Sequence, residues 1–276
     1  MQKILILLVL LSVLTGCANA KAQDPAEIAE PIKASVNYGV SDIYLDRYFI
    51  AANEELYLKY RQDFADARST VEYVNTMAYL TPNEDYVNSD LTVGTMIMAN
   101  KYHYLGEYVP EDLVQTDALY GQDGRTALLN AEAYEAYKKM YTAAAAAGMK
   151  LVINSFYRSY ALQVATYNNF LTFDPQEKVD TYSSRPGFSD HQTGLVVDIL
   201  TPGHSFDSFE DTPEAAWLAE NAHNYGFILR YPKGKENITK YKYEAWHYRY
   251  VGEEAQAIFA SGLTFDEYYA YYYENK

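Results

Sequence analysis

Two short segments of this 276-residue chain carry residues that could do metal chemistry together. His191 lies seven residues before Asp198, and Glu244 lies three residues before His247. Two imidazoles and one carboxylate form an open three-ligand set for zinc, which leaves the fourth position for water, as catalytic zinc sites do. Zinc lowers the pKa of such a water to about 7, and a nearby carboxylate accepts its proton. The candidate ligands are His191, Asp198 and His247, and Glu244 is the candidate general base.

Each of these residues, taken alone, also fits a structural role. On spacing alone, either histidine fits a packed or solvated position, and Asp198 fits a turn cap or an arginine partner. The pattern Glu-x-x-His is far less specific than His-Glu-x-x-His. The other three histidines, at positions 103, 204 and 223, lie among residues typical of loops or helix surfaces. A charged aspartate inside an apolar strand is nevertheless costly unless it is paired or bound to metal.

Short strands and helices alternate irregularly around these segments. The periodicity and the Gly and Pro positions predict strands at 150–156, 194–200, 225–231 and 243–251, and helices at 131–148, from 157 onward, at 213–225 and at 253–261. This order predicts an α+β fold with a small antiparallel sheet flanked by helices.

The preceding part of the chain carries no recognisable chemical signal. Mixed helical spacing over 42–75 predicts an N-terminal helical extension, and the run 91–98 predicts a strand. The region 36–95 as a whole could position the protein on a cell wall, bind a partner or only pack against the rest. The 30 tyrosines suit stacking on sugar rings, but a run such as 268–273 is more typical of one edge of an amphipathic C-terminal helix.

Several ordered motifs resemble one known family. The segments 189–198 (Ser-x-His-x-x-Gly-x-Val-x-Asp) and 244–247 (Glu-x-Trp-His) closely resemble the zinc signatures of the VanY-like D-alanyl-D-alanine carboxypeptidases. This family also includes L,D-carboxypeptidases and D-Ala-D-Ala dipeptidases. The segment 155–163 (Ser-Phe-Tyr-Arg-Ser-x-x-x-Gln) is similar to its substrate-side motif. The resemblance runs from about residue 98 to 252 and implies a hedgehog/D-Ala-D-Ala peptidase-like fold, with a catalytic domain over 96–276.

The resemblance also implies roles for individual residues. It gives His191, Asp198 and His247 as ligands of a Zn²⁺ cofactor and Glu244 as the general base. Arg158 would contact the scissile carbonyl or other polar groups of the substrate, which suits a guanidinium facing a carboxylate or an oxyanion. Ser155, Gln163 and Ser189 would bind substrate, and the last two would help to hold the terminal D-alanine.

Two positions depart from the usual pattern of the family. Val196 stands where the family usually has Ala, and Ala245 stands where it usually has Pro before Trp-His. We expect the larger Val196 to narrow the pocket and Ala245 to loosen the backbone ahead of Trp246. Neither change removes a ligand or the base.

The N-terminus predicts a lipid-anchored protein. One lysine and an apolar run, too short to span a bilayer, precede Leu14-Thr15-Gly16-Cys17, which resembles a bacterial lipobox. We expect residues 1–16 to be a lipoprotein signal peptide, Cys17 to carry the lipid, and the Ala/Pro/Glu-rich segment 17–35 to be a flexible spacer. Alternatives are a plain secretory signal with an incidental Cys17 and an uncleaved anchor. The predicted location is extracytoplasmic, at the bacterial cell membrane.

The charge and composition exclude several classes of function. The chain carries 22 Lys and Arg against 37 Asp and Glu, a net charge of −15, and has no basic run, so nucleic acid is not an expected partner. A hydrophobic content of 49% excludes global disorder. We expect a zinc D-alanyl-D-alanine carboxypeptidase that trims peptidoglycan stem peptides. The alternatives are an L,D-carboxypeptidase acting on tetrapeptide stems and a non-catalytic wall-binding lipoprotein. The sequence leaves the oligomeric state open.

Overall fold

The computed structural model describes residues 40–274, which lie in a compact unit spanning Tyr38–Lys276. The predicted signal peptide, Cys17 and the spacer 17–35 lie outside the described residues. The described residues of the region predicted over 36–95 and of the catalytic region predicted over 96–276 share this one unit. No helix among residues 40–274 is long and apolar enough to cross a membrane.

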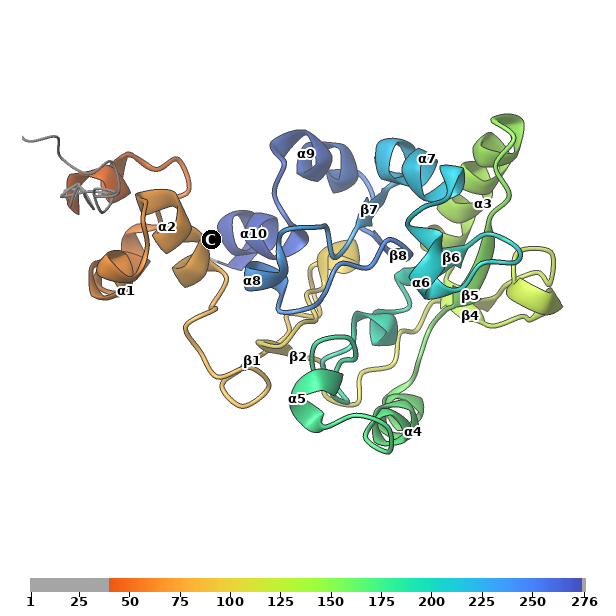
Figure 1. Cartoon of the computed structure of the whole chain (residues 1–276), viewed down its shortest axis with the longest axis horizontal. Coiled ribbons are helices and arrows are strands. Elements are labelled where there is room, and N and C mark those ends of the chain that lie inside the picture. The colour runs from red at the N-terminus through yellow and green to blue at the C-terminus, as the bar shows by residue number, and fades with distance from the viewer. Residues whose placement is uncertain (1–39, 275–276) are drawn as a thin grey trace, which may run out of the picture. The chain divides into compact units, whose positions relative to one another are not determined.

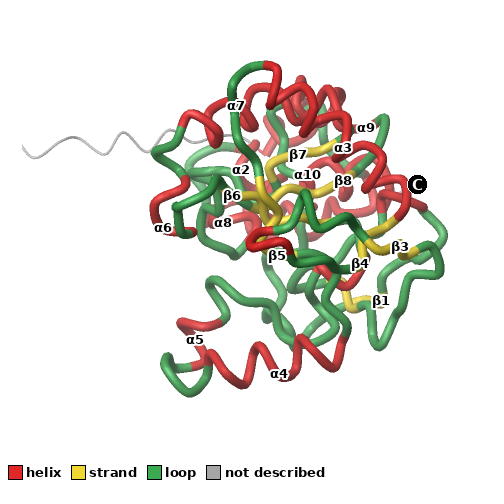
Figure 2. Tube along the Cα trace, turned by 90° about the vertical axis from the view of Figure 1, so that its right-hand side faces the viewer, coloured by secondary structure: helices red, strands yellow, loops and turns green. Residues whose placement is uncertain are grey.

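A four-stranded antiparallel sheet forms the centre of this unit (Figures 1 and 2). Its strand order is β5 (Val152–Ser155), β6 (Val196–Leu200), β8 (His247–Tyr250) and β7 (Phe227–Leu229). The predicted α+β class is therefore confirmed, and all four strands lie within the predicted runs. The run 243–251 forms a strand only in its second half, because a turn precedes His247.

The apolar face of the sheet is covered by α3 (Ala131–Ala146) and α7 (Pro213–Asn221). Both helices start where side chains cap the first turn: Asn130 accepts from the Ala133 N–H, and Thr212 accepts from the Ala215 N–H. Alternate residues of β6 point into this core, including Val197 and Ile199. Asp198, between them in sequence, is therefore directed to the opposite face of the sheet.

The remaining helices lie around the sheet. In Figures 1 and 2, α4 and α5 lie on the side away from α3 and α7. The bounds of these helices are α4 Tyr160–Phe170, α5 Gln176–Val179, α6 Phe206–Phe209, α8 Glu236–Thr239, α9 Glu254–Ser261 and α10 Phe265–Tyr269. Two small two-stranded sheets complete the unit: β1 (Val87–Asn88) with β2 (His103–Tyr104), and β3 (Leu113–Gln115) with β4 (Leu128–Asn130).

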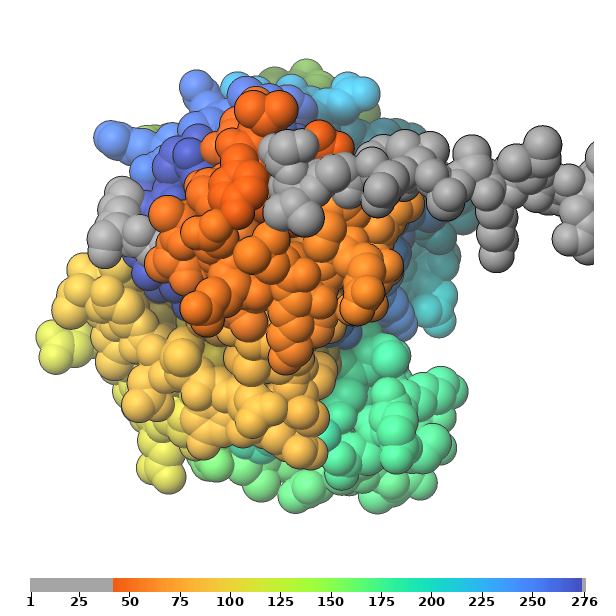
Figure 3. Space-filling model, turned by 90° about the vertical axis from the view of Figure 1, so that its left-hand side faces the viewer, coloured from red at the N-terminus to blue at the C-terminus, as the bar shows by residue number. Residues whose placement is uncertain are grey.

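The N-terminal helices pack against the C-terminal end of the chain. Helices α1 (Glu54–Tyr60) and α2 (Ala67–Asn75) enclose a small core, and in Figure 3 the orange atoms of this segment cover one face. Tyr48 meets Tyr271 edge to face with ring centroids 4.9 Å apart, and Arg68 lies 3.7 Å from Glu267. The predicted N-terminal helices are confirmed, and they pack onto α10 and the π-helical turn that follows it.

Two expectations about local structure are wrong. Residues 91–98 form turns with a single 3₁₀ turn at Gly94–Met96, because Gly94 adopts a φ of 59°, which an extended strand cannot contain. His103 lies in β2 and is 4% exposed, with its ring bonded to Asn100 and Glu274, so it is not a surface residue. By contrast, the tyrosine-rich run 268–273 is helical as predicted, and Tyr268 and Tyr269 are buried.

Candidate metal centre and active site

The register of the sheet brings three predicted site residues side by side. Asp198 on β6 faces His247 on β8, and its neighbour on the other side is Ser155 on β5. Directly paired residues of antiparallel strands have side chains on the same face, only about 5 Å apart. Strand pairing thus brings Asp198 and His247, which lie 49 positions apart in the sequence, into one site.

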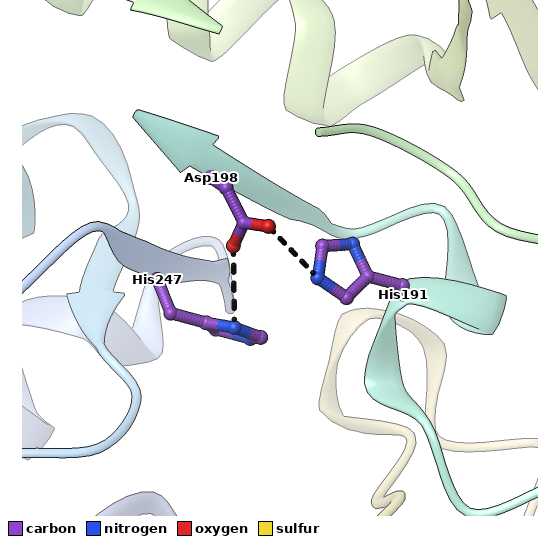
Figure 4. A group of neighbouring side chains, drawn as sticks. All are labelled: His191, Asp198 and His247. Atoms are coloured by element: carbon purple, nitrogen blue, oxygen red, sulfur yellow. Dashed lines mark ion pairs between the residues drawn. The ribbon is translucent and has the colours of Figure 1, made fainter. Parts of the chain in front are cut away.

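A tight turn adds His191 to this group. Residues Asp190–Thr193 form a buried 3₁₀ turn, which ends at Gly194 in the left-handed conformation with a φ of 70°. This backbone conformation favours glycine, and a Cβ atom at Gly194 would also displace the end of the Leu113 side chain, whose Cδ2 would lie 2.7 Å away. The turn directs His191 toward Asp198 in the middle of β6, as Figure 4 shows.

The hydrogen bonds of the two imidazoles fix which nitrogen is free. His191 Nδ1 lies 2.8 Å from the carbonyl oxygen of Phe156, so it must donate, and the Nε2 lone pair faces Asp198 Oδ2 at 3.4 Å. His247 Nε2 lies 3.2 Å from Asp190 Oδ2 and donates to it. The His247 Nδ1 lone pair then faces Asp198 Oδ1 at 3.3 Å.

These donor atoms fit a divalent cation. One ligand atom from each of His191, Asp198 and His247 lies within 4.8 Å of the others, and all three side chains are buried. Asp198 Oδ1 accepts no hydrogen bond from any described residue. Lone pairs that converge without a proton between them repel one another unless a cation lies among them. Two imidazoles and a carboxylate are typical ligands of zinc, and their outer-shell bonds to a carboxylate and a carbonyl are typical of histidines that bind it.

The buried charged groups of the site shift the pKa values of His247 and Asp198 in opposite directions. Burial alone would lower the pKa of His247, but the carboxylates of Asp190, Glu244 and Asp198 raise it to about 10. Burial alone would raise the pKa of Asp198, yet the adjacent His191 and His247 hold it below its usual value. The site therefore favours a positive charge at its centre.

Glu244 lies next to the ligand group without belonging to it. Its Oε2 is 3.3 Å from His247 Nδ1, and the residue is 6% exposed. Its backbone N–H donates to the carbonyl of Tyr231 at 3.2 Å, which holds the turn before β8. Burial is the main cause that raises the pKa of Glu244 above its usual value. This position and basicity suit a group that takes a proton from water.

A cavity of about 420 Å³ opens over the metal site. The predicted residues Ser155, Arg158, Ser189 and Glu244 line it together with all three candidate ligands. The rest of its wall combines small polar side chains with aromatic and charged ones, among them Phe170, Tyr182, Asp207, Tyr231, Tyr241, Lys242 and Trp246. A peptide terminus of a few residues fits a space of this size.

Arg158 is held in the cavity wall by two neighbours. Its Nη1 donates to Gln163 Oε1 and its Nη2 donates to Ser155 Oγ, both at 2.9 Å. The remaining guanidinium N–H groups are available to substrate, and the positive charge contributes to the low pKa of Asp198.

Gln163 does not have the predicted place in contact with substrate. It is 0% exposed, it is absent from the lining of the cavity, and its Nε2 donates to the Ser184 carbonyl at 2.6 Å. It lies on the buried side of α4, where it orients Arg158 instead. Val196 likewise lies outside the lining although it is fully buried, so it does not narrow the pocket as expected.

Two residues of the site were missed at the level of sequence. Asp190, next to His191, is 1% exposed and anchors His247. A carboxylate directly before a candidate histidine ligand, in a turn bounded by Gly187 and Gly194, is the signal that could have identified it. Lys242 lines the cavity beside the rings of Tyr182 and Trp246, at 5.4 and 5.8 Å, and no described carboxylate pairs with it. A lysine two residues before the candidate base carried no distinctive sequence signal.

Comparisons with known proteins bear on this site. The family described as "VanY: D-alanyl-D-alanine carboxypeptidase" matches residues 126–253, which include every candidate site residue except Cys17. The solved LdcB LD-carboxypeptidase is 36% identical, with a TM-score of 0.63, over 67% of this chain and 90% of LdcB. The chain belongs to the VanY-like D-alanyl-D-alanine carboxypeptidase family.

Other members of the VanY-like family agree with this assignment. VanYB in complex with D-alanine-D-alanine is 30% identical with a TM-score of 0.54, over 63% of this chain and 96% of VanYB. A variant of the VanY D,D-pentapeptidase from the VanB-type resistance cassette, also 30% identical, was solved in complex with Zn(II); its TM-score is 0.53, over 63% of this chain and 98% of that one. These matches confirm the predicted family and fold and support a zinc-dependent carboxypeptidase.

The match to curated relatives is partial. YodJ of Bacillus subtilis is 39% identical over 181 residues, which cover 63% of this chain and 66% of YodJ. The D-alanyl-D-alanine carboxypeptidase of Enterococcus faecium is 34% identical over 192 residues, 66% of this chain and 60% of that protein. The chain thus spans no more than about two thirds of the length of these curated relatives.

Proposed function

We propose that this protein is a zinc-dependent carboxypeptidase that removes the C-terminal D-alanine from peptidoglycan stem peptides. The observation that carries the proposal is the convergence of free lone pairs from His191, Asp198 and His247, with Glu244 beside them, at the floor of an open cavity. The likeness to carboxypeptidases, including VanYB with bound D-alanine-D-alanine, supports the choice of substrate.

Zinc held by His191, Asp198 and His247 would supply a water of lowered pKa and polarise the scissile carbonyl. Glu244 accepts the proton of the attacking water at its carboxylate and later gives it to the leaving amine. Arg158 stabilises the negative charge that develops on the carbonyl oxygen, since its guanidinium is already oriented by Ser155 and Gln163. Closure around the site is unnecessary for this orientation, because both hydrogen bonds exist without substrate.

The cations of the cavity suit an anionic peptide end. Every stem peptide ends in a carboxylate, and Arg158 and Lys242 both line the cavity. Lys242 has no ion-pair partner among the described residues, and its exposed position allows it to meet the substrate before the peptide reaches the metal. We assign Lys242 to attraction of the substrate and Arg158 to the reacting carbonyl.

An L,D-carboxypeptidase that shortens tetrapeptide stems is the second candidate. The specific observation in its favour is that the TM-score to LdcB, 0.63, exceeds the 0.54 to VanYB. The two candidates share the metal, base and arginine, so they differ only in which stem is shortened.

One assay tests both candidates. The protein is incubated with pentapeptide and tetrapeptide stems, with and without a chelator, and the products are read by mass spectrometry. Chelator-sensitive loss of one alanine from the pentapeptide supports the D,D activity, and loss from the tetrapeptide supports the L,D activity. If zinc-loaded protein shortens neither peptide, the proposal fails and the non-catalytic wall-binding lipoprotein takes its place.

We also propose that Cys17 is lipidated and that the protein acts outside the cytoplasmic membrane. The lipobox-like Leu14-Thr15-Gly16-Cys17 after a short apolar run supports this. Metabolic labelling with a fatty acid should label the wild-type protein and leave Cys17→Ala unlabelled and released from the membrane fraction. Equal membrane retention of the two proteins would contradict the anchor.

A further inference from the structure

A line of buried charges joins the ligand His247 to the C-terminal helix α10. Asp190 Oδ2 accepts from His247 Nε2 at 3.2 Å and lies 3.4 Å from Arg230 Nε. The other end of the same guanidinium is paired with Asp266 in α10, to which Nη1 and Nη2 both donate. Each of these four residues is at most 4% exposed.

Asp266 determines how the guanidinium can lie. An arginine remains charged even when buried, so Arg230 requires carboxylates around it. Asp266 engages both Nη atoms, which fixes the plane of the guanidinium and turns Nε toward Asp190. Nε makes no hydrogen bond to any described residue, so its only close partner there is the ion pair with Asp190 Oδ2. Asn100 donates to Asp266 Oδ1 at 2.7 Å and holds that carboxylate in turn.

Asp190 Oδ2 therefore accepts the hydrogen bond from His247 Nε2 and is also ion-paired with Arg230 Nε. Without the Asp266 carboxylate, the Arg230 guanidinium would pair, among the described carboxylates, with Asp190 alone. It would then compete with His247 Nε2 for the same oxygen of Asp190. The orientation of His247 and the availability of its Nδ1 lone pair depend on that bond.

We propose that Asp266 is a positioning residue for the metal site, which acts on His247 through Arg230 and Asp190. This inference rests on the proposed function, in which the site holds zinc. It gives α10, through Asp266, a role in the affinity for metal. Nothing in the reaction requires Asp266 to touch the substrate.

The substitution Asp266→Asn keeps the size of the side chain and removes its charge. Replacing the hydrogen-bond partner of a metal-binding histidine typically lowers the affinity for metal about 10- to 100-fold. Asp190→Asn removes such a direct partner, so we expect a loss in that range. Asp266 acts on His247 only through Arg230 and Asp190, so we expect a smaller effect: the Kd for zinc should rise about 10-fold in Asp266→Asn.

Glu267 offers a matched control on the same helix. It neighbours Asp266, is 5% exposed and is also ion-paired, at 3.3 Å from Lys235 and 3.7 Å from Arg68. None of its partners contacts the ligand group. Glu267→Gln is expected to lower stability in the same way as Asp266→Asn, but to leave the Kd for zinc unchanged.

The experiment measures zinc affinity of the full chain by competition with a chromophoric chelator, and the thermal unfolding of each metal-free variant. If Asp266 acts through Asp190, the double variant D190N/D266N binds zinc as weakly as D190N alone. Asp266→Glu, which retains the carboxylate, should recover most of the affinity.

Several results would overturn the inference. These are a wild-type Kd in Asp266→Asn, an equal loss in Glu267→Gln, or losses that add fully in the double variant. If Asp266→Asn does not fold, Asn100→Ser, which removes one hydrogen bond to Asp266, replaces it in the double-variant test under the same criteria. A wild-type chain that binds no zinc would overturn the proposed function itself, and this inference with it.

Discussion

Glu244→Gln is the most direct test of the proposed chemistry. The substitution conserves the volume of a side chain that is 6% exposed, and it removes the one property that the mechanism uses, a carboxylate able to accept a proton. Glu244 does not belong to the converging ligand group of His191, Asp198 and His247. Zinc should therefore remain bound while turnover is lost.

The size of the loss follows from the surroundings of Glu244. General base catalysis contributes about 10²- to 10⁴-fold, or about 3 to 5 kcal/mol of transition-state free energy at 1.36 kcal/mol for each factor of ten. Among the described residues, the only other carboxylate near His247 Nδ1 is the ligand Asp198. No second base is in position to replace Glu244, so we expect the loss in kcat to fall in the upper half of this range, about 10³- to 10⁴-fold.

The assay combines turnover with metal content. Release of D-alanine from the preferred stem peptide is followed at saturating substrate, and bound zinc is quantified in the same samples. Glu210→Gln is the control, because Glu210 is exposed, pairs among the described residues only with the exposed Lys233 at 3.3 Å, and lies outside the cavity lining. It should retain wild-type kcat and zinc.

A kcat for Glu244→Gln within tenfold of wild type, in protein with one bound zinc, would refute the role of Glu244 as base. Loss of zinc together with activity would instead place Glu244 among the ligands. Both results would contradict the separation of base and ligands that the geometry indicates.

Three further predictions concern the cavity and its support. Arg158→Ala should lower kcat by about 10²- to 10³-fold with zinc retained, as expected when an oxyanion donor is lost, and a steady-state assay with zinc analysis checks this. Lys242→Met should raise KM severalfold with little change in kcat and should weaken the salt dependence of kcat/KM, measured between low and high ionic strength. Burial lowers the pKa of Lys101 to about 8, so the unfolded chain binds more protons between pH 8 and the ordinary lysine value, and stability rises with pH there. Denaturant unfolding between pH 8 and 9.5 should show a rise of up to about 1.4 kcal/mol per pH unit that Lys101→Met lacks; an equal slope in both proteins would contradict it.

Sequence patterns were sufficient for the elements of the sheet and for the ligand set. The apolar run 194–200, interrupted by one aspartate, predicted both a strand and an unusual charge, and the structure has β6 with Asp198 in its middle. Glycine signals were equally informative: Gly148 ends α3 with a φ of 83°, as predicted for a helix stop. These features are local, so a single sequence contains them in full.

Features that depend on long-range packing were not accessible in this way. The run 91–98 has the composition of a strand, but Met96 and Met98 pack with α9 and α10, and Gly94 bends the chain between them and the preceding loop. Gln163 follows Arg158 at a spacing that suits a shared role in binding, yet its side chain is buried and donates to the distant Ser184 carbonyl. Side-chain direction relative to a cavity requires the tertiary contacts themselves.

The outer support of the metal site is the clearest case of information spread over the chain. His247, Asp190, Arg230 and Asp266 come from four elements, and no pair among them has a spacing typical of a motif. Arg230 lies on the segment that follows β7. Its burial as a charged residue is explained only by the fold, which places Asp190 and Asp266 on either side of its guanidinium. A ligand motif states which atoms can bind zinc, whereas the affinity depends on how firmly those atoms are oriented. Since that orientation is transmitted through a buried arginine to the C-terminal helix, substitutions far from the motif should change metal binding while leaving every ligand in place.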